Sequence, residues 1–114
     1  MLPKLNRLRK KKEFGRVLRK GKGVKEDFLV LKIIKNNLPQ TRIGLIVGIK
    51  VSNKATLRNK IKRRVKALMA AKLPKIKKGF DIVLITKPGI EERDFWEMAE
   101  ILDKLLKKVK IIND

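Results

Sequence analysis

The sequence contains no cysteine, no histidine and no tyrosine, and only one tryptophan and four phenylalanines among its 114 residues. Without cysteine there are no disulfides and no thiolate metal sites, and without histidine the commonest metal ligand and general base is missing. No nucleophile and base pair of the usual kind is therefore available. No apolar run approaches the roughly 18 residues that a membrane-spanning helix requires. These absences argue against a metalloprotein, a hydrolase with its own nucleophile, and a membrane protein.

The N-terminal stretch MLPKLNRLRKKK has no apolar segment of the kind found in secretory signals, so we expect a cytoplasmic protein. The length predicts a single domain spanning 1–114, with residues 1–10 as a flexible basic N-terminus. A hydrophobic fraction of 43% is enough for a folded core and excludes a wholly disordered basic tail.

Acidic residues are scarce, because 11 Asp and Glu face 32 Lys and Arg, which gives a net charge of +21. Self-repulsion of this size destabilises a compact chain unless a polyanion offsets it, so nucleic acid or an anionic membrane is the expected partner. The charge is also uneven. No acid occurs between Phe28 and Phe80, whereas seven of the eleven acids lie between Glu91 and Asp114. This asymmetry predicts one binding side and one solvated side.

Hydrophobic spacing predicts a mixture of helices and strands. Apolar residues at helical spacing, closed by glycines, predict a first helix within 10–22. Residues 28–35 and 42–49 are rich in β-formers and predict a hairpin, whose second strand is apolar enough to be buried on both faces. Residues 80–86 predict a further strand, and 91–109 a strongly amphipathic helix. The order is α-β-β-α-β-α with room for a short strand near 22–27 or 50–53, which indicates an α+β sandwich.

The segment ATLRNKIKRRVKALMA, residues 55–70, combines six Lys or Arg with an apolar periodicity and contains no acid. At about 100° per residue its apolar side chains form one stripe, and its basic side chains face away from that stripe. Arg58 and Arg64 fall at the two borders, where a long stem packs on apolar surface while the charged head reaches outward. Ser52, Asn53 and Thr56 are all candidates for the N-cap. The segment therefore predicts a helix with one buried and one cationic face.

The uniform charge of this face indicates a binding surface. A solvated helix usually alternates Glu with Lys at i,i+4, because like charges at that spacing cost a few tenths of a kcal/mol per pair. The core needs the apolar stripe, which makes a membrane-surface helix the weaker account. No helix-turn-helix, zinc or dimerising heptad pattern supports DNA reading. A basic helix against a sheet with few aromatics suits RNA recognised through its shape and backbone.

Residues 50–66, KVSNKATLRNKIKRRVK, resemble the signature of the bacterial ribonuclease P protein subunit, in which an Arg-Asn-Arg core is followed by a Lys-Arg pair. Here the core is Arg58-Asn59-Lys60, followed by Lys62-Arg63. The stretches NRLRKKKEFGRVLRKGK, RIGLIV and GFDIVLITKPG resemble the family's flanking sequences, in the same order around the basic helix. The resemblance extends over nearly the whole chain.

The resemblance implies an α+β fold, an α-β sandwich of three helices and a four-stranded mixed sheet. Its order would be α-β-β-β-α-β-α with a left-handed crossover, as in the second domain of the fifth small-subunit ribosomal protein. It also implies a role in tRNA processing, as the protein subunit of the endoribonuclease that removes the 5′ leader of precursor tRNA. In this family Mg²⁺ is held mainly by the catalytic RNA, which performs the chemistry. We therefore expect the catalytic RNA and precursor tRNA as partners, with no catalytic or metal-ligating residue in this chain, no membrane and no dedicated protein partner.

The resemblance and the charge pattern together predict the RNA-binding residues, which are Lys50, Lys54, Arg58, Asn59, Lys60, Lys62, Arg63 and Lys66. Two positions depart from the family pattern. Lys60 replaces an arginine, so the planar bidentate fork is lost, and Ile49 stands where a basic residue is usual. The resemblance also implies a leader cleft between the first helix and the sheet, lined by Phe14, Val17, Leu18 and Leu31. The simpler alternative is that these four only pack on the sheet.

Two further alternatives remain open. The protein could be a structural protein that binds ribosomal RNA and has no role in tRNA processing. Glu26 and Asp27 offer hard oxygen ligands for Mg²⁺, although a turn at a strand entry is the simpler interpretation. The remaining aromatic residues are expected to pack in the core or along helices; these are Phe28, Phe80, Phe95 and Trp96.

Overall fold

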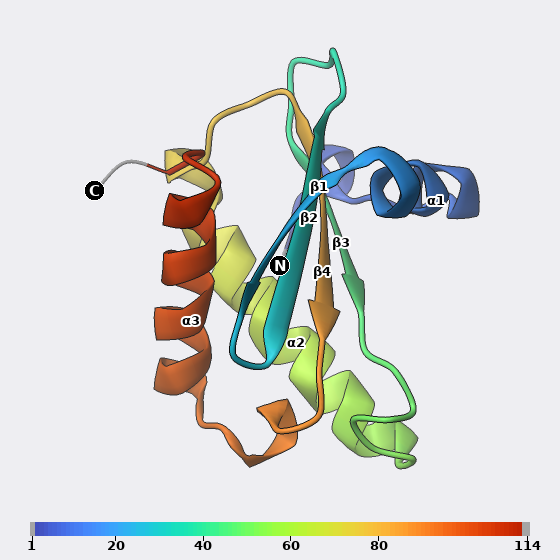
Figure 1. Ribbon diagram of the computed structural model, residues 1–114, viewed down its shortest axis with the longest axis vertical. Helices are drawn as coiled ribbons and strands as arrows, with labels where there is room; N and C mark the ends of the chain where they lie inside the picture. The colour runs from blue at the N-terminus through green and yellow to red at the C-terminus, as the bar shows by residue number, and fades with distance from the viewer. Residues whose placement is uncertain (1, 113–114) are drawn as a thin grey trace.

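The computed structural model describes residues 2–112 of the chain. Over this range three α-helices and four strands follow one another in the predicted order α-β-β-β-α-β-α (Figure 1). The additional short strand is the one near 22–27, and no strand forms at 50–53. The elements are α1 (Lys11–Lys20), β1 (Lys22–Glu26), β2 (Leu29–Lys35), β3 (Arg42–Ile46), α2 (Ala55–Lys72), β4 (Phe80–Thr86) and α3 (Phe95–Lys108).

The four strands form one mixed sheet in the order β1-β2-β4-β3. β2 is antiparallel to both β1 and β4, whereas β3 is parallel to β4. The predicted hairpin between β2 and β3 is therefore wrong, because β4 lies between them. β4 is buried on both of its faces, and β3 is an edge strand that ends at Ile46. Two apolar segments that follow one another in the sequence suggest a hairpin. However, β4 has two apolar faces, and a central position in the sheet buries both of them.

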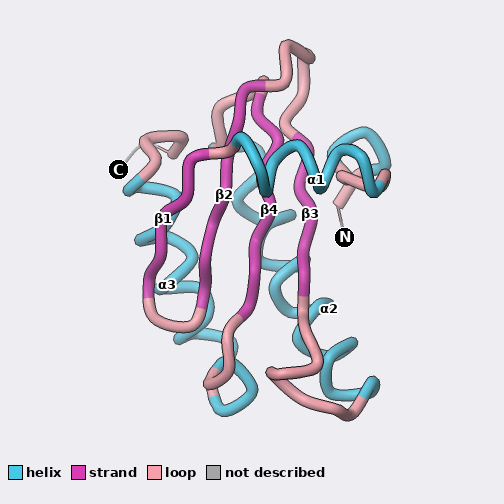
Figure 2. Tube along the Cα trace, turned by 45° about the vertical axis from the view of Figure 1, so that its right-hand side comes forward, coloured by secondary structure: helices cyan, strands magenta, loops and turns pink. Residues whose placement is uncertain are grey.

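The connection from β3 through α2 to β4 is left-handed. In Figure 2 both strands run downward, β4 lies to the left of β3, and α2 crosses behind the sheet. Because about 98% of such connections are right-handed, general rules alone would predict the opposite hand. The handedness that the family resemblance implied is confirmed.

The helices divide unequally between the two faces of the sheet (Figures 1 and 2). α2 and α3 cover one face and enclose the main core, whereas α1 lies alone across one end of the other face. Fully burying a large aliphatic side chain contributes roughly 1.5–3 kcal/mol, so most of the stabilisation comes from the α2 and α3 side. That core includes Leu31, Ile61, Met69, Ile82, Leu84, Leu102, Leu105 and Leu106, all at most 1% exposed. A smaller cluster under α1 contains Leu8, Val17 and Val83.

Residues 2–8 pack along the free edge of β3, in place of the flexible N-terminus that the sequence predicted. The backbone N–H of Leu8 donates to the Ile43 carbonyl at 2.9 Å, and Arg7 forms an isolated parallel bridge with Ile43. Leu2 and Leu8 are 3% and 5% exposed. An unpaired strand edge offers hydrogen-bonding groups that a neighbouring segment can satisfy, and the two leucines hold this segment in place.

Helix α2 has the two faces that its sequence predicted. Ile61, Val65, Leu68 and Met69 are buried, and Arg58 and Arg64 are half-buried at the borders of that stripe. None of the three candidate N-caps occupies the cap position, which falls at Lys54 without a side-chain hydrogen bond. The Ser52 hydroxyl instead accepts the Lys54 backbone N–H at 3.1 Å.

Helix α3 begins with a capping box, in which the Asp94 carboxylate accepts the Glu97 backbone N–H at 2.8 Å. The remaining aromatics were expected to pack in the core or along helices. Phe28 lies in the core and is 2% exposed, whereas Trp96, at the start of α3, is 76% exposed and packs edge-on against the Phe95 ring. None of the helices within 2–112 is both long and apolar enough to cross a bilayer.

Candidate nucleic-acid interface

A groove of about 350 Å³ opens beside β3, between the N-terminal segment, α1 and α2. We call it the β3-edge groove. An apolar floor inside a cationic rim is how proteins hold single-stranded nucleic acid without reading its bases. The floor consists of Leu2, Leu8, Phe14, Ile43, Gly44 and Leu45, and the rim of Arg7, Arg9, Arg63 and Lys66.

The predicted RNA-binding residues lie on the solvent-facing side of α2 and on the loop before it. Lys50, Lys54, Asn59, Lys60, Arg63 and Lys66 are exposed, and Lys62 is half-buried. Within residues 2–112 none of the lysines and the arginine in this set forms an ion pair with a carboxylate. Arg63 and Lys66 also line the β3-edge groove. The cationic face of α2 and the groove are thus one continuous surface.

Arg58 differs from its neighbours because it has a partner within the protein. Its Nη1 donates to the Ser52 carbonyl at 2.9 Å, and its side chain is half-buried. The loop before α2 is thereby tied to the first turn of the helix. Arg58, placed by the sequence at the border of the buried stripe, therefore also holds the start of the helix.

The four residues predicted to line a leader cleft have different surroundings. Phe14 lies in the groove, with its ring against the backbone of β3. A Cβ atom on Gly44 would lie 2.4 Å from the Phe14 Cζ, so only glycine leaves room for the ring. Leu18 is half-buried on the same side of the sheet, whereas Val17 is fully buried beneath α1 and presents no surface.

The assignment of Leu31 to this cleft is wrong. Its side chain is 0% exposed and packs in the main core, on the face covered by α2 and α3. Side chains alternate along a strand, so Leu29, Leu31 and Ile33 share that face and Val30, Lys32 and Ile34 point to the α1 side. Both faces of β2 are largely apolar, and the sequence therefore did not reveal which set faces α1.

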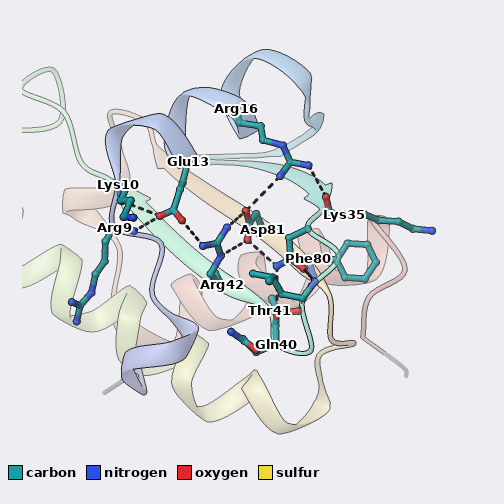
Figure 3. A network of polar contacts seen from close by, with 12 residues as sticks. Arg9, Lys10, Glu13, Arg16, Lys35, Gln40, Thr41, Arg42, Phe80 and Asp81 are labelled. Carbon is teal, nitrogen blue, oxygen red and sulfur yellow. Dashed lines mark hydrogen bonds and ion pairs between the residues drawn. The ribbon is translucent and has the colours of Figure 1, made fainter.

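A network of charged groups fastens α1 to the sheet (Figure 3). Asp81 of β4 is 1% exposed, and its carboxylate accepts hydrogen bonds from Arg42 Nε at 2.8 Å and Arg42 Nη2 at 2.7 Å. Asn36 Nδ2 adds a third donor at 2.9 Å, and Arg16 of α1 lies 3.8 Å away. The remaining nitrogen of Arg42, Nη1, pairs with Glu13. One guanidinium therefore joins a buried strand carboxylate to the first turn of α1.

Glu13 also closes the start of α1. Its Oε1 accepts the backbone N–H of Lys10 at 3.0 Å and of Arg9 at 3.3 Å. The Lys10 hydrogen bond is the main cause that holds the pKa of Glu13 below its ordinary value of 4.5. Arg9 and Arg42 lower this pKa further, whereas partial burial raises it. The hydrogen bond with Asp81 is the main cause that raises the pKa of Arg42. Both charges are therefore fixed at neutral pH, directly beside Phe14.

Comparison with known proteins matches residues 2–110 to the family model of Ribonuclease P. The chain belongs to the bacterial ribonuclease P protein family. The ribonuclease P protein component of Clostridium botulinum (strain Langeland) is 40% identical over 111 residues, covering 96% of this chain and 99% of the relative. The RNase P protein structure from Thermotoga maritima has a TM-score of 0.83 at 36% identity, covering 91% of this chain and 97% of that one. The structure from Staphylococcus aureus has a TM-score of 0.87 at 28% identity, covering 95% and 98%.

Glu26 and Asp27 are the acidic residues that the sequence suggests as possible ligands for Mg²⁺. Within the described residues no three His, Cys, Asp or Glu side chains come together as metal ligands. Glu26 lies 2.6 Å from Lys108, whose hydrogen bond lowers the pKa of Glu26. Asp27 forms the β1–β2 turn with φ at 51° and lies 3.8 Å from Arg93. Both carboxylates therefore lie at a turn and have cationic partners within the protein.

Sequence reasoning missed two parts of the site. Arg7 and Arg9 fell within the segment predicted to be flexible, and only the contact with β3 places them on the groove. The Arg42–Asp81 pair has a clearer signal in the sequence, because Asp81 is the single charged residue in the strand FDIVLIT. A buried carboxylate requires a cationic partner. With 32 basic residues in the chain, the sequence could not say which one it is.

Proposed function

We propose that this protein binds the catalytic RNA of ribonuclease P and assists it in removing the 5′ leader of precursor tRNA. The observation that carries the proposal is the continuity of two surfaces. The cationic face of α2 suits a folded RNA, the β3-edge groove suits a single strand, and Arg63 and Lys66 belong to both. A protein that must hold a structured RNA and an unpaired leader together needs this combination.

The face of α2 would bind the catalytic RNA through its phosphates. Each contact releases condensed counterions, so affinity falls steeply as the salt concentration rises. The salt slope, which is the slope of log affinity against log salt concentration, steepens by roughly 0.7–0.9 for each phosphate contacted. Asn59, Arg63 and Lys66 are spaced by four and three residues and therefore form one ridge along the helix. Mg²⁺ would be held mainly by the RNA. The protein cations would reduce the repulsion between RNA, leader and substrate, so that less Mg²⁺ is needed.

The β3-edge groove would hold the leader. Phe14 is the aromatic residue of its floor, and stacking of one base on an aromatic ring is worth roughly 1–3 kcal/mol. The cations of the rim would bind the phosphates on either side. Mature tRNA has no leader, so this contact favours the substrate over the product.

The deciding experiment is processing of precursor tRNA by the cognate catalytic RNA, with and without the protein, over a range of Mg²⁺ concentrations. We expect the protein to lower the Mg²⁺ requirement, to bind leader-bearing RNA more tightly than mature tRNA, and to cleave nothing alone. A structural ribosomal-RNA-binding protein would leave the Mg²⁺ requirement unchanged and would not distinguish precursor from product. That result would refute the proposal.

A further inference from the structure

A second groove of about 330 Å³ lies at the opposite edge of the sheet, between the start of β1, the end of β2 and the C-terminal end of α3. We call it the β1-edge groove. Four lysines surround four apolar residues, an arrangement of the same kind as in the β3-edge groove. The lining residues are Lys22, Lys35, Lys108 and Lys110, with Ile33, Ile34, Phe80 and Val109.

Three of these lysines carry uncompensated charge. Lys22, Lys35 and Lys110 are exposed, and within residues 2–112 their side chains have neither an ion pair nor a hydrogen bond. Lys108 is the exception, since it pairs with Glu26 and donates to the Lys25 carbonyl. Like charges that converge on one hollow repel each other, and a bound polyanion would relieve that repulsion.

Backbone hydrogen bonds hold the chain in place at the end of α3, beside the β1-edge groove. Lys110 has φ at 59°, a left-handed conformation that few residues other than glycine adopt, at the point where α3 ends. The next residue, Ile111, is 2% exposed; its N–H donates to the Leu106 carbonyl, and its carbonyl accepts the Lys77 N–H at 2.8 Å. Phe80 and Val109 remain half-exposed in the floor. The charges therefore surround apolar surface on which bases can lie.

The two grooves lie at opposite ends of α1. Phe14, near the start of the helix, belongs to the β3-edge groove, and Lys22, two residues after its end, belongs to the β1-edge groove. The ten residues of α1 span about 15 Å, similar to the roughly 14 Å across four neighbouring strands. Along this path Arg16 of α1 donates to the Lys35 carbonyl at 3.1 Å (Figure 3). An RNA strand that runs along α1 from one groove to the other would therefore pass Arg16 on the way.

We propose that the β1-edge groove binds the distal part of the precursor-tRNA leader, the part that extends beyond the β3-edge groove. This inference rests on the proposed function. The groove is too small for an RNA duplex and suits one or two unpaired nucleotides. Its lysines are point charges without the planar fork of arginine, so binding is independent of leader sequence and depends on leader length.

The test uses two triple variants of equal charge in the reconstituted holoenzyme. The groove variant carries Lys22→Ser, Lys35→Ser and Lys110→Ser. The control carries Lys75→Ser, Lys87→Ser and Lys104→Ser, which are exposed lysines outside both grooves and away from α1. Binding is measured for mature tRNA and for precursors with a short and a long leader. We expect the groove variant to lose about fivefold or more in affinity for the long leader alone, with a salt slope lower by about 2.

Each outcome has a distinct meaning. If both variants bind the long leader equally well, the inference is overturned while the proposed function stands. If even the wild-type holoenzyme fails to prefer precursors over mature tRNA, the proposed function itself fails and this inference with it. As an independent readout, a photoreactive uridine in the distal leader should crosslink to the peptides that contain Lys22 or Lys35. Crosslinks confined to α2 would contradict the assignment.

Discussion

Arg42 reaches across from β3 to the neighbouring strand β4 and forms two hydrogen bonds with the carboxylate of Asp81, at 2.8 and 2.7 Å. The same guanidinium pairs with Glu13 at the start of α1. The position of α1 over the sheet, and with it the position of Phe14 in the β3-edge groove, thus depends on one buried carboxylate. This contact links the stability of the fold to the shape of the site.

Replacing Arg42 with methionine should destabilise the protein by about 3–5 kcal/mol, because Asp81 would remain buried without its partner. Urea unfolding at pH 7 measures this loss. Arg19→Met, on the exposed side of α1, serves as the control and should change stability by less than about 0.5 kcal/mol. The double variant Arg42→Met with Asp81→Leu should regain much of the lost stability, since it removes both buried charges. An Arg42→Met protein as stable as the control would show that the Arg42–Asp81 pair does not contribute to the stability of the fold.

Glu13 should make a pH-dependent contribution to stability. Its pKa in the folded protein lies below the ordinary value of 4.5. The stabilisation is therefore fully present above that value and is lost as the pH falls through the folded pKa. We expect wild type to be more stable than Glu13→Gln at pH 7, and the difference to shrink toward pH 3 in thermal unfolding experiments. A difference that is constant over this range would mean that the charge of Glu13 plays no part.

Two basic residues of α2 should respond differently to truncation. Lys62→Ala and Arg58→Ala should each weaken binding to the catalytic RNA by roughly 1 kcal/mol and lower the salt slope by about one unit. Arg58→Ala should also lower the unfolding temperature, because it loses the hydrogen bond to the Ser52 carbonyl. Filter binding over a salt series and thermal unfolding separate the two effects. Unchanged RNA affinity in both variants would show that this face of α2 does not contact the catalytic RNA.

Gly44→Ala should disturb the groove through Phe14. The new Cβ would lie 2.4 Å from the ring, so the ring must move, at a cost of about 1–3 kcal/mol. We expect a reduced preference for leader-bearing RNA at unchanged affinity for the catalytic RNA. Adding Phe14→Leu should recover stability without restoring the preference. If Gly44→Ala keeps the full preference for precursor, Phe14 is not a leader contact.

Ile49→Lys should strengthen binding to the catalytic RNA. Ile49 is 74% exposed on the loop before α2, next to Lys50, so the substitution removes no core packing. One added phosphate contact should steepen the salt slope by about 0.7–0.9 and raise affinity several-fold at low salt. Ile49→Gln is the matched control without charge. Equal affinity of the two variants would mean that no phosphate lies within reach of this position.

Local patterns in the sequence were sufficient to predict the three α-helices and the basic face of α2. A periodicity of three and four residues places Ile61, Val65 and Met69 on one side whatever the helix packs against, and the lysines on the other side follow from the same geometry. The strands β2 and β4 were equally clear. These features depend on residues close together in the chain.

The arrangement of these elements depends on tertiary contacts that local sequence patterns do not predict. The insertion of β4 between β2 and β3, the docking of residues 2–8 on β3 and the pairing of Arg42 with Asp81 all join segments that are far apart in the sequence. The misplacement of Leu31 has the same origin, because β2 is apolar on both faces and only packing selects which one meets α1. The sequence by itself determined a basic helix suited to RNA. The tertiary structure determined the grooves, since each of them is lined by segments that no local pattern brings together.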